Sequence, residues 1–118
     1  MSNKFAVKAW AEPLRTVAFG SLTGSLAAIG LPLANPARVM FVTNGTDANV
    51  DISLDGVHNM FCLLPGSSLT LDLTTNKSND EGLFFAIGTQ IYVAYESVVP
   101  TVGNVYLSIV YGTTGTTL

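Results

Sequence analysis

The stretch Pro36–Leu73, PARVMFVTNGTDANVDISLDGVHNMFCLLPGSSLTLDL, decides the fold of this chain. Apolar and polar residues alternate through Val50–Asp55 and again through Leu69–Leu73. Period-two alternation places one set of side chains on a core face and the other set in water. The runs are separated by pairs that supply the positive or fixed φ of a tight reversal, namely Asn44-Gly45, Asp55-Gly56 and Pro65-Gly66. The stretch therefore predicts consecutive antiparallel strands, as in a β-meander or Greek key.

The same pattern extends in both directions along the chain. Arg38–Thr43 is nearly continuously apolar, which is typical of a central strand covered on both faces. In Asn104–Tyr111, the residues Val105, Leu107, Ile109 and Tyr111 share one face. Further strands are expected at Leu14–Phe19, Ala48–Leu54, Met60–Leu64, Ser68–Leu73, Leu83–Ile87 and Gln90–Tyr95. About eight or nine short strands with turn signals roughly every 8–12 residues predict an all-β sandwich or small barrel without substantial helix.

With 118 residues the chain is long enough for one domain with a single core. Residues 1–13 are predicted to form an N-terminal arm, residues 14–112 the β-sandwich domain, and residues 113–118 a flexible Gly/Thr-rich tail. The arm carries Phe5 and the only tryptophan, Trp10, and has the alternation of a short edge strand. Chain ends are mobile unless they are tied down, so these aromatic residues indicate docking, either on the arm's own sheet or on a neighbouring subunit.

Charged residues make up only 11% of the chain, against about 25% in an average soluble domain. Small domains have much surface for their volume, and interface cores are depleted in charge. The deficit indicates a subunit that hides surface against other chains; the alternative is a Thr- and Ser-rich surface that stays soluble alone. The five lysines and arginines are scattered, so no basic stripe for nucleic acid is expected. We see no signal peptide and no membrane-spanning run, and expect a chain made in the cytoplasm without a membrane anchor.

Residues 20–35, GSLTGSLAAIGLPLAN, are small and apolar and are interrupted by Gly24, Gly30 and Pro32. The glycines disfavour a lasting helix, so we expect a long loop containing a short strand or one turn of helix. Loops of this length in compact domains usually have a function. Its apolar residues indicate contact with a partner, or else a plug over the open end of the barrel.

Residues for catalysis or metal binding are few. The single Cys62 excludes an internal disulfide and a multi-cysteine metal site, and its apolar run predicts a buried, inert thiol. His58 lies in a turn, where a lone histidine is most often a solvated surface residue. With Asp55 or Asp51 it would supply too few ligands for a dedicated zinc site. We therefore expect no enzyme activity, no cofactor and no metal.

The order of several short motifs resembles a known family. These motifs are Ala34–Val39, Thr43–Asp47, Ser53–Gly56, Leu64–Ser67, Leu71–Asn76, Gly88–Val93 and Gly103–Gly112. Over about Glu12 to Gly112 the chain resembles the jelly-roll capsid decoration proteins (cement or staple proteins) of short-tailed bacteriophages. The resemblance implies an eight- to nine-stranded jelly roll on the outer surface of a virion. It also implies binding to the major capsid protein, stabilisation of the contacts between capsid subunits, and self-association as a homodimer or homotrimer.

On this basis we expect Phe5 and Trp10 of the arm, and Leu22, Leu26, Ile29 and Leu31 of the apolar loop, to form the partner interface. Two other functions stay open. The chain could be a neck, tail or fibre-base component of a virion. It could also be a carbohydrate-binding sandwich in which Tyr92, Tyr95, Tyr106 or Trp10 stacks on sugar rings.

Overall fold

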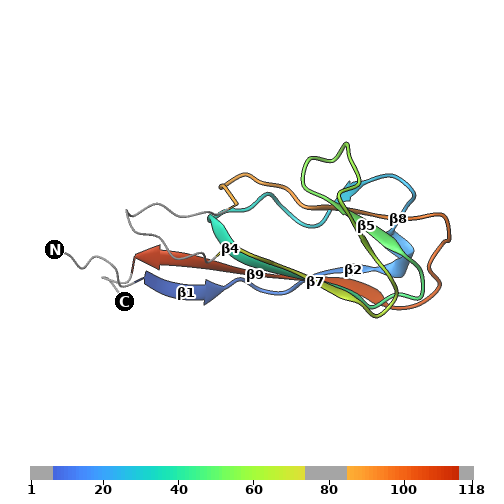
Figure 1. Ribbon diagram of the computed structural model, residues 1–118, viewed down its shortest axis with the longest axis horizontal. Helices are drawn as coiled ribbons and strands as arrows, with labels where there is room; N and C mark the ends of the chain where they lie inside the picture. Colours follow the sequence, from blue (N-terminus) through green and yellow to red (C-terminus); the bar gives the residue numbers. More distant parts are fainter. Residues whose placement is uncertain (1–6, 74–84, 115–118) are drawn as a thin grey trace.

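The computed structural model describes residues 7–73 and 85–114 and shows two antiparallel sheets packed as a β-sandwich (Figure 1). The larger sheet, sheet A, contains β1 (Val7–Ala11), β2 (Arg15–Ala18), β4 (Ala37–Asn44), β7 (Ser68–Asp72) and β9 (Asn104–Thr114). The smaller sheet, sheet B, contains β3 (Ala27–Ala28), β5 (Val50–Ser53), β6 (Phe61–Leu63) and β8 (Tyr92–Tyr95). A single turn of 3-10 helix, η1 (Phe19–Ser21), follows β2. No helix in these two segments has the length and apolar character needed to span a bilayer.

The strand order is that of a jelly roll. Sheet A runs β2-β9-β4-β7 with β1 beside β9, and sheet B runs β3-β8-β5-β6. Along the chain β2–β3, β4–β5, β6–β7 and β8–β9 each pass from one sheet to the other. This alternation produces the double Greek key of an eight-stranded jelly roll, to which β1 adds a ninth strand. The predicted all-β sandwich is confirmed.

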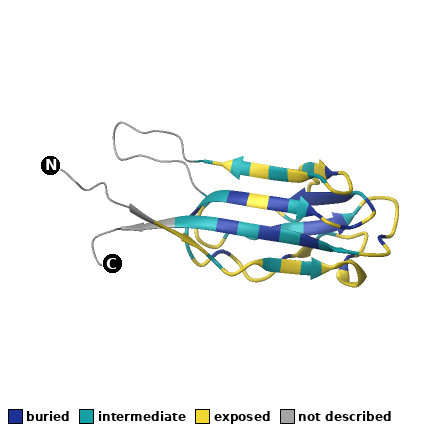
Figure 2. Cartoon of the chain, turned by 90° about the horizontal axis from the view of Figure 1, so that it is seen from below, coloured by how far each residue is buried: buried dark blue, intermediate teal, exposed yellow. Residues whose placement is uncertain are grey.

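The core lies between the sheets and follows the period-two pattern (Figure 2). On β9, Val105, Leu107 and Ile109 are buried, as predicted from their shared face. They oppose the inward residues of β4, because Val42 pairs with Leu107 and Met40 with Ile109. Burying a large aliphatic side chain contributes roughly 1.5–3 kcal/mol, so this stripe is a main source of stability.

Two expectations about strand faces were wrong. Phe41 on β4 is 41% exposed, so this central strand is covered on one face only. On β5, Asp51 and Ser53 were expected in water, but both are buried. The turn after β5 closes on Ser53, since the backbone N–H groups of Asp55 and Gly56 donate to the Ser53 hydroxyl, and the side chains of Cys62 and Glu96 lie beside Asp51.

The described part of the N-terminal arm, from Val7 onward, is part of the protein's own sheet, which was one of the two predicted docking modes. β1 pairs with β9 from Val7 opposite Thr114 to Ala11 opposite Val110, and β2 continues along the same edge. Between them the register shifts by one residue at Glu12–Leu14, where Pro13 lacks a backbone donor. At the other end β9 reaches Thr114, so the strand extends beyond the predicted start of the tail at residue 113.

The outer parts of β1 and β9 project beyond the sandwich as a two-stranded ribbon (Figures 1 and 2). The principal extents are 55 × 25 × 22 Å, and the radius of gyration is 15.9 Å. A compact domain of this length would have a radius of about 13.5 Å. The molecule is therefore elongated along the direction of β9. The predicted polar loop at 74–82 lies outside the described residues, as do Leu83 and Phe84 of the predicted strand Leu83–Ile87. Phe85 of that strand forms an isolated bridge with Ala37.

Candidate functional site

The apolar loop between η1 and β4 folds against the core. Leu22 is 7% exposed and Ile29 1% exposed, and both belong to the hydrophobic core. The backbone N–H of Ile29 donates to the Ile91 carbonyl, and that of Leu33 to the Thr89 carbonyl. Both side chains are therefore core residues, which fits the alternative of a loop that covers the open side of the sandwich, and their contact with a partner stays a prediction.

Leu31 and Leu26 differ from those two. Leu31 is 79% exposed, and Leu26 is half-buried. Leu31 is held in place by Arg15, whose guanidinium donates to the carbonyls of Ile29 and Leu31 at 2.9 and 2.7 Å. Arg15 also pairs with Glu12 at 2.7 Å. Leu31 is therefore an exposed apolar side chain on a hydrogen-bonded loop, and such exposure is what the predicted partner interface requires.

The two aromatic residues of the predicted interface lie on the arm. Trp10 is 42% exposed and is the register partner of Tyr111 across β1 and β9. It therefore belongs to the projecting ribbon. Phe5 lies outside the described residues.

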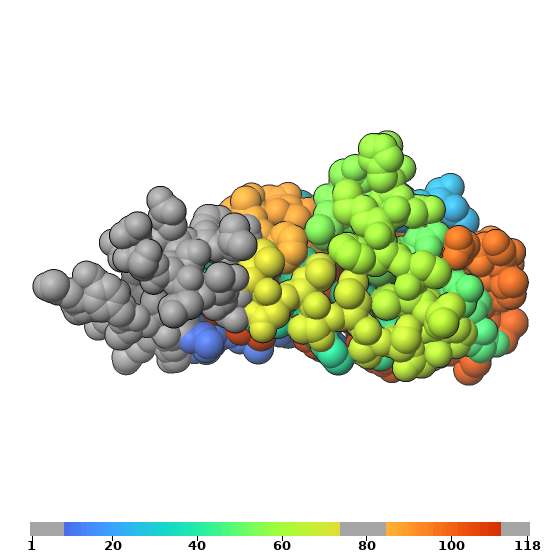
Figure 3. Space-filling model, in the orientation of Figure 1, coloured from blue at the N-terminus to red at the C-terminus, as the bar shows by residue number. Residues whose placement is uncertain are grey.

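The structure reveals an apolar end that the sequence reasoning missed. Five large exposed apolar residues lie in the connections at the end of the sandwich opposite the ribbon, namely Phe19, Leu64, Val98, Val99 and Val102. We call this set the apolar loop end. Figure 3 shows the β8–β9 connection in orange-red at this end of the molecule, on the right. Its members come from three connections between residues 19 and 102, so no single run of sequence signals it.

Hydrogen bonds hold the connections of the apolar loop end together. The Phe19 N–H donates to the Gly103 carbonyl at 3.0 Å, and the Glu96 N–H donates to the Asn49 carbonyl at 2.9 Å. The Thr101 N–H donates to an Asp47 carboxylate oxygen at 2.8 Å, and the Thr101 hydroxyl bonds the other oxygen. These bonds to Thr101 lower the pKa of Asp47. The apolar side chains are thus presented by loops whose shape is set before any partner arrives.

A buried asparagine organises the same end. Asn44 is fully buried and donates through Nδ2 to the carbonyls of Ala48 and Leu63 at 2.8 and 2.9 Å. Its Oδ1 accepts from the N–H and the hydroxyl of Thr46. All polar atoms of this amide are satisfied, so it fixes the β4–β5 turn against β6.

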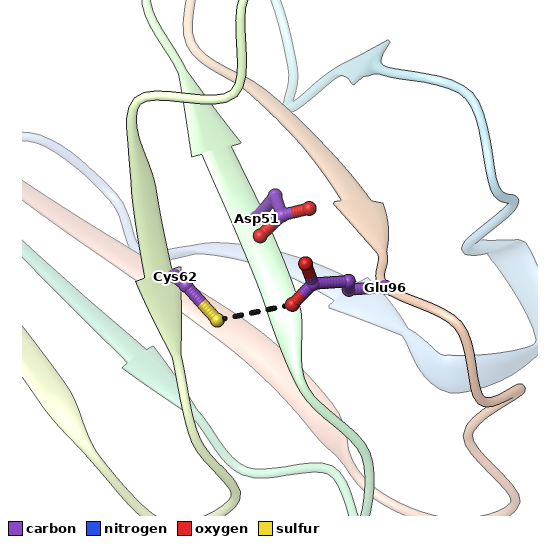
Figure 4. A group of neighbouring side chains, drawn as sticks. All are labelled: Asp51, Cys62 and Glu96. Atoms are coloured by element: carbon purple, nitrogen blue, oxygen red, sulfur yellow. Dashed lines mark hydrogen bonds between the residues drawn. The ribbon is translucent and has the colours of Figure 1, made fainter.

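Three chemically reactive side chains meet on the outer face of sheet B (Figure 4). Asp51 on β5 is the register partner of Cys62 on β6, and the Cys62 thiol donates to Glu96 Oε1 at 3.3 Å. Cys62 is exposed, so the predicted buried thiol is wrong. The hydrogen bond to Glu96, together with desolvation and the nearby carboxylates, raises the pKa of Cys62 to about 11. Burial, with Glu96 as the second cause, raises the pKa of Asp51.

His58 is a solvated surface residue, as predicted. Its side chain is 76% exposed, and its Nδ1 lies 2.7 Å from an Asp55 carboxylate oxygen. The other Asp55 oxygen accepts from the N–H groups of Val57 and His58. The interaction with His58, followed by these backbone bonds, holds the pKa of Asp55 far below its usual range. This pair closes the β5–β6 turn.

The four aromatic side chains considered for sugar stacking do not form one platform. Tyr92 and Tyr95 are half-buried and occupy positions of opposite parity on β8, so their rings point to opposite faces of sheet B. Tyr106 belongs to the other sheet. A groove of about 290 Å³ lies between β2 and β3 and is lined mainly by small residues. Trp10, at the ribbon, is the one member with an exposed ring.

No protein-family model matches this chain, and no curated protein sequence is similar enough to count as a match.

Proposed function

We propose that this protein is a non-enzymatic structural component of a bacteriophage virion, a decoration protein that binds the outer capsid surface and stabilises contacts between major capsid subunits. The observation that carries the proposal is the apolar loop end, where five large apolar side chains are exposed on hydrogen-bonded loops. Scattered exposed apolar residues are normal in soluble proteins, but a group at one end of a domain marks an interaction site.

The low charge supports the same conclusion. Only 11% of the residues are charged, and cores of protein interfaces are depleted in charge. The resemblance to jelly-roll decoration proteins, together with the jelly-roll strand order, suggests which assembly the protein joins. Jelly rolls also serve as lectins and enzymes, so the strand order alone does not carry the function.

The shape suits a clamp. The apolar loop end and the β1–β9 ribbon with Trp10 lie at opposite ends of a molecule 55 Å long. A protein with contact surfaces at both ends can bind two neighbouring capsid subunits at once. Because it then binds only the assembled shell, mass action stabilises the assembled state. Self-association as a homodimer or homotrimer would repeat the same contacts around a symmetry axis.

The first test is the copy number of the chain in purified particles of the phage that encodes it, with its position determined by electron cryo-microscopy. A decoration protein is expected in hundreds of copies on the outer shell. A copy number in the tens at the neck, tail or fibre base would assign it to those parts instead. Absence of the chain from mature particles would refute both virion roles.

The second test probes the apolar loop end directly. Val99→Asp places a charge among the exposed apolar residues, and Val57→Asp is the matched control in the β5–β6 turn, since Val99 and Val57 are 59% and 74% exposed. Leaving an unpaired charge buried in an interface typically costs about 2 kcal/mol or more, so Val99→Asp should weaken co-sedimentation with undecorated capsids at least about 30-fold. Val57→Asp should leave capsid binding unchanged. Equal binding by both variants would exclude the apolar loop end as the capsid contact.

Trp10→Ala examines the other end. If the ribbon contacts a second capsid subunit, this variant should still bind capsids but should protect them less against heat-induced release of DNA. Unchanged heat protection would remove the ribbon from the proposed clamp.

A further inference from the structure

The outer face of sheet B brings together three side chains with metal-binding atoms. Asp51 comes from β5, Cys62 from β6, and Glu96 directly follows β8 (Figure 4). One ligand atom from each lies within 4.8 Å of the other two. Because β5 lies between β6 and β8, the backbone ladders of the sheet fix the relative positions of these residues.

The environment of Asp51 indicates that a ligand binds here. It is only 4% exposed, and a carboxylate removed from water needs a donor or a counter-ion. The single thiol proton of Cys62 is donated to Glu96 Oε1 at 3.3 Å. No backbone N–H or hydroxyl of the described residues donates to the Asp51 side chain. Outside the group itself, this buried carboxylate has no hydrogen-bond partner within residues 7–73 and 85–114.

Neither arginine of the chain supplies the missing positive charge. Arg15 is engaged by Glu12 and by two loop carbonyls, and Arg38 donates to the Leu73 carbonyl at 3.3–3.4 Å. Two carboxylates and a thiol therefore face one another without an arginine between them.

We propose that Asp51, Cys62 and Glu96 bind a divalent transition-metal cation of the zinc class. The ligand set selects among metals, because a sulfur ligand favours zinc over magnesium and calcium, whereas the two oxygens are acceptable to zinc. Tetrahedral zinc with bonds of about 2.3 Å to sulfur and about 2.0 Å to oxygen places these two ligands about 3.5 Å apart. The observed separation of Cys62 Sγ and Glu96 Oε1 is 3.3 Å.

Three protein ligands leave a fourth position of the tetrahedron for water or for a group of a partner protein. Binding displaces the thiol proton of Cys62 to solvent. The cation joins β5, β6 and the end of β8, and β6 is a three-residue edge strand. Since the ligands come from distant parts of the chain, binding favours the folded state. The inference is independent of the proposed virion function.

The test uses cobalt(II) as a spectroscopic substitute for zinc with the full chain. A thiolate ligand gives an intense charge-transfer absorption in the near ultraviolet, which carboxylate, water or imidazole ligands do not give. We expect this band at one equivalent of cobalt, its loss when zinc is added, and a rise of several degrees in the unfolding midpoint with zinc. Cys62→Ser should abolish the band. Loss of a residue that only supports a metal ligand costs roughly 10- to 100-fold in metal affinity. Glu96→Gln removes a direct ligand and should therefore weaken zinc binding by more than that.

His58→Gln is the matched control, because His58 is exposed and is the only other residue with a strong affinity for zinc or cobalt. This variant should bind like the unmodified chain. Absence of the charge-transfer band in the folded unmodified chain would overturn the proposal. So would zinc binding that survives in Cys62→Ser and disappears in His58→Gln. If Cys62→Ser fails to fold, the spectrum of the unmodified chain and the affinity of Glu96→Gln still decide.

Discussion

Gly103 lies directly against the carbonyl group of Gly45, so that a Cβ atom added at Gly103 would be 2.0 Å from the Gly45 oxygen. The contact joins the β8–β9 connection to the β4–β5 turn. Gly103 also has a φ of +95°, a value that residues with a side chain rarely adopt. The apolar loop end therefore depends on a backbone contact that only glycine permits.

Gly103→Ala should lower the free energy of unfolding by about 3 kcal/mol or more, because steric overlap with backbone adds to the conformational cost. Gly66→Ala is the matched control: its φ is +78°, but no atom lies within 4 Å of an added Cβ. The control should cost only about 1–2 kcal/mol. Urea unfolding of the two variants measures the difference, and equal losses would show that the Gly45 contact is not tight.

Asn44→Ala should also destabilise the protein, by about 3 kcal/mol or more. The substitution removes the Asn44 donor to the Leu63 carbonyl and the Asn44 acceptor of the Thr46 N–H in a buried site, and each unsatisfied group costs roughly 1–3 kcal/mol. Asn59→Ala, at an exposed position in the β5–β6 turn, should change stability by less than about 0.5 kcal/mol. Comparable unfolding midpoints for the two variants would contradict the structural role of Asn44.

Cys62 should react slowly with iodoacetamide although it is exposed. At pH 8 a thiol with a pKa of about 11 is roughly 0.1% ionised, against about a quarter for an ordinary cysteine. A more basic thiolate is also a better nucleophile, which reduces the expected deficit to about 20-fold. Glu96→Gln removes the first cause of the raised pKa and should speed alkylation of the metal-free protein. If Cys62 of the unmodified chain were alkylated as fast as free cysteine, its thiol would not be hydrogen-bonded to Glu96.

The Asp47–Thr101 contact should make the apolar loop end sensitive to acid. The hydrogen bonds from Thr101 lower the pKa of Asp47 in the folded state, so their stabilisation is present above the unfolded pKa of about 3.9. The stabilisation is lost as the pH falls through the lower folded value. Nuclear magnetic resonance titration should find Asp47 below its ordinary range, and Thr101→Ala should raise its pKa toward the ordinary value. An unchanged titration in the variant would exclude Thr101 as the cause.

Much of the fold could be predicted from local sequence, because alternation and turn residues act over a few positions. The alternation in β9 correctly placed Val105, Leu107 and Ile109 on the buried face. Alternation distinguishes the two faces of a strand, but it cannot show whether a loop covers the outer one. For this reason Asp51 and Ser53 were assigned to water, although Cys62 and Glu96 lie beside Asp51 and the turn after β5 folds back beside Ser53.

The candidate sites depended on contacts between distant residues, which only the tertiary structure decides. Leu22 and Leu31 occupy the same apolar loop, yet Leu22 is buried and Leu31 is exposed. The loop's hydrogen bonds to β2 and to the segment before β8 fix which of its side chains point inward. Asp51 and Cys62 become neighbours through the register of β5 and β6, and Glu96 joins them from the end of β8. By itself, the sequence determined that the chain builds an all-β sandwich with little charge. The register of its strands and the path of its loops decided which side chains meet, since those contacts join residues far apart in the chain.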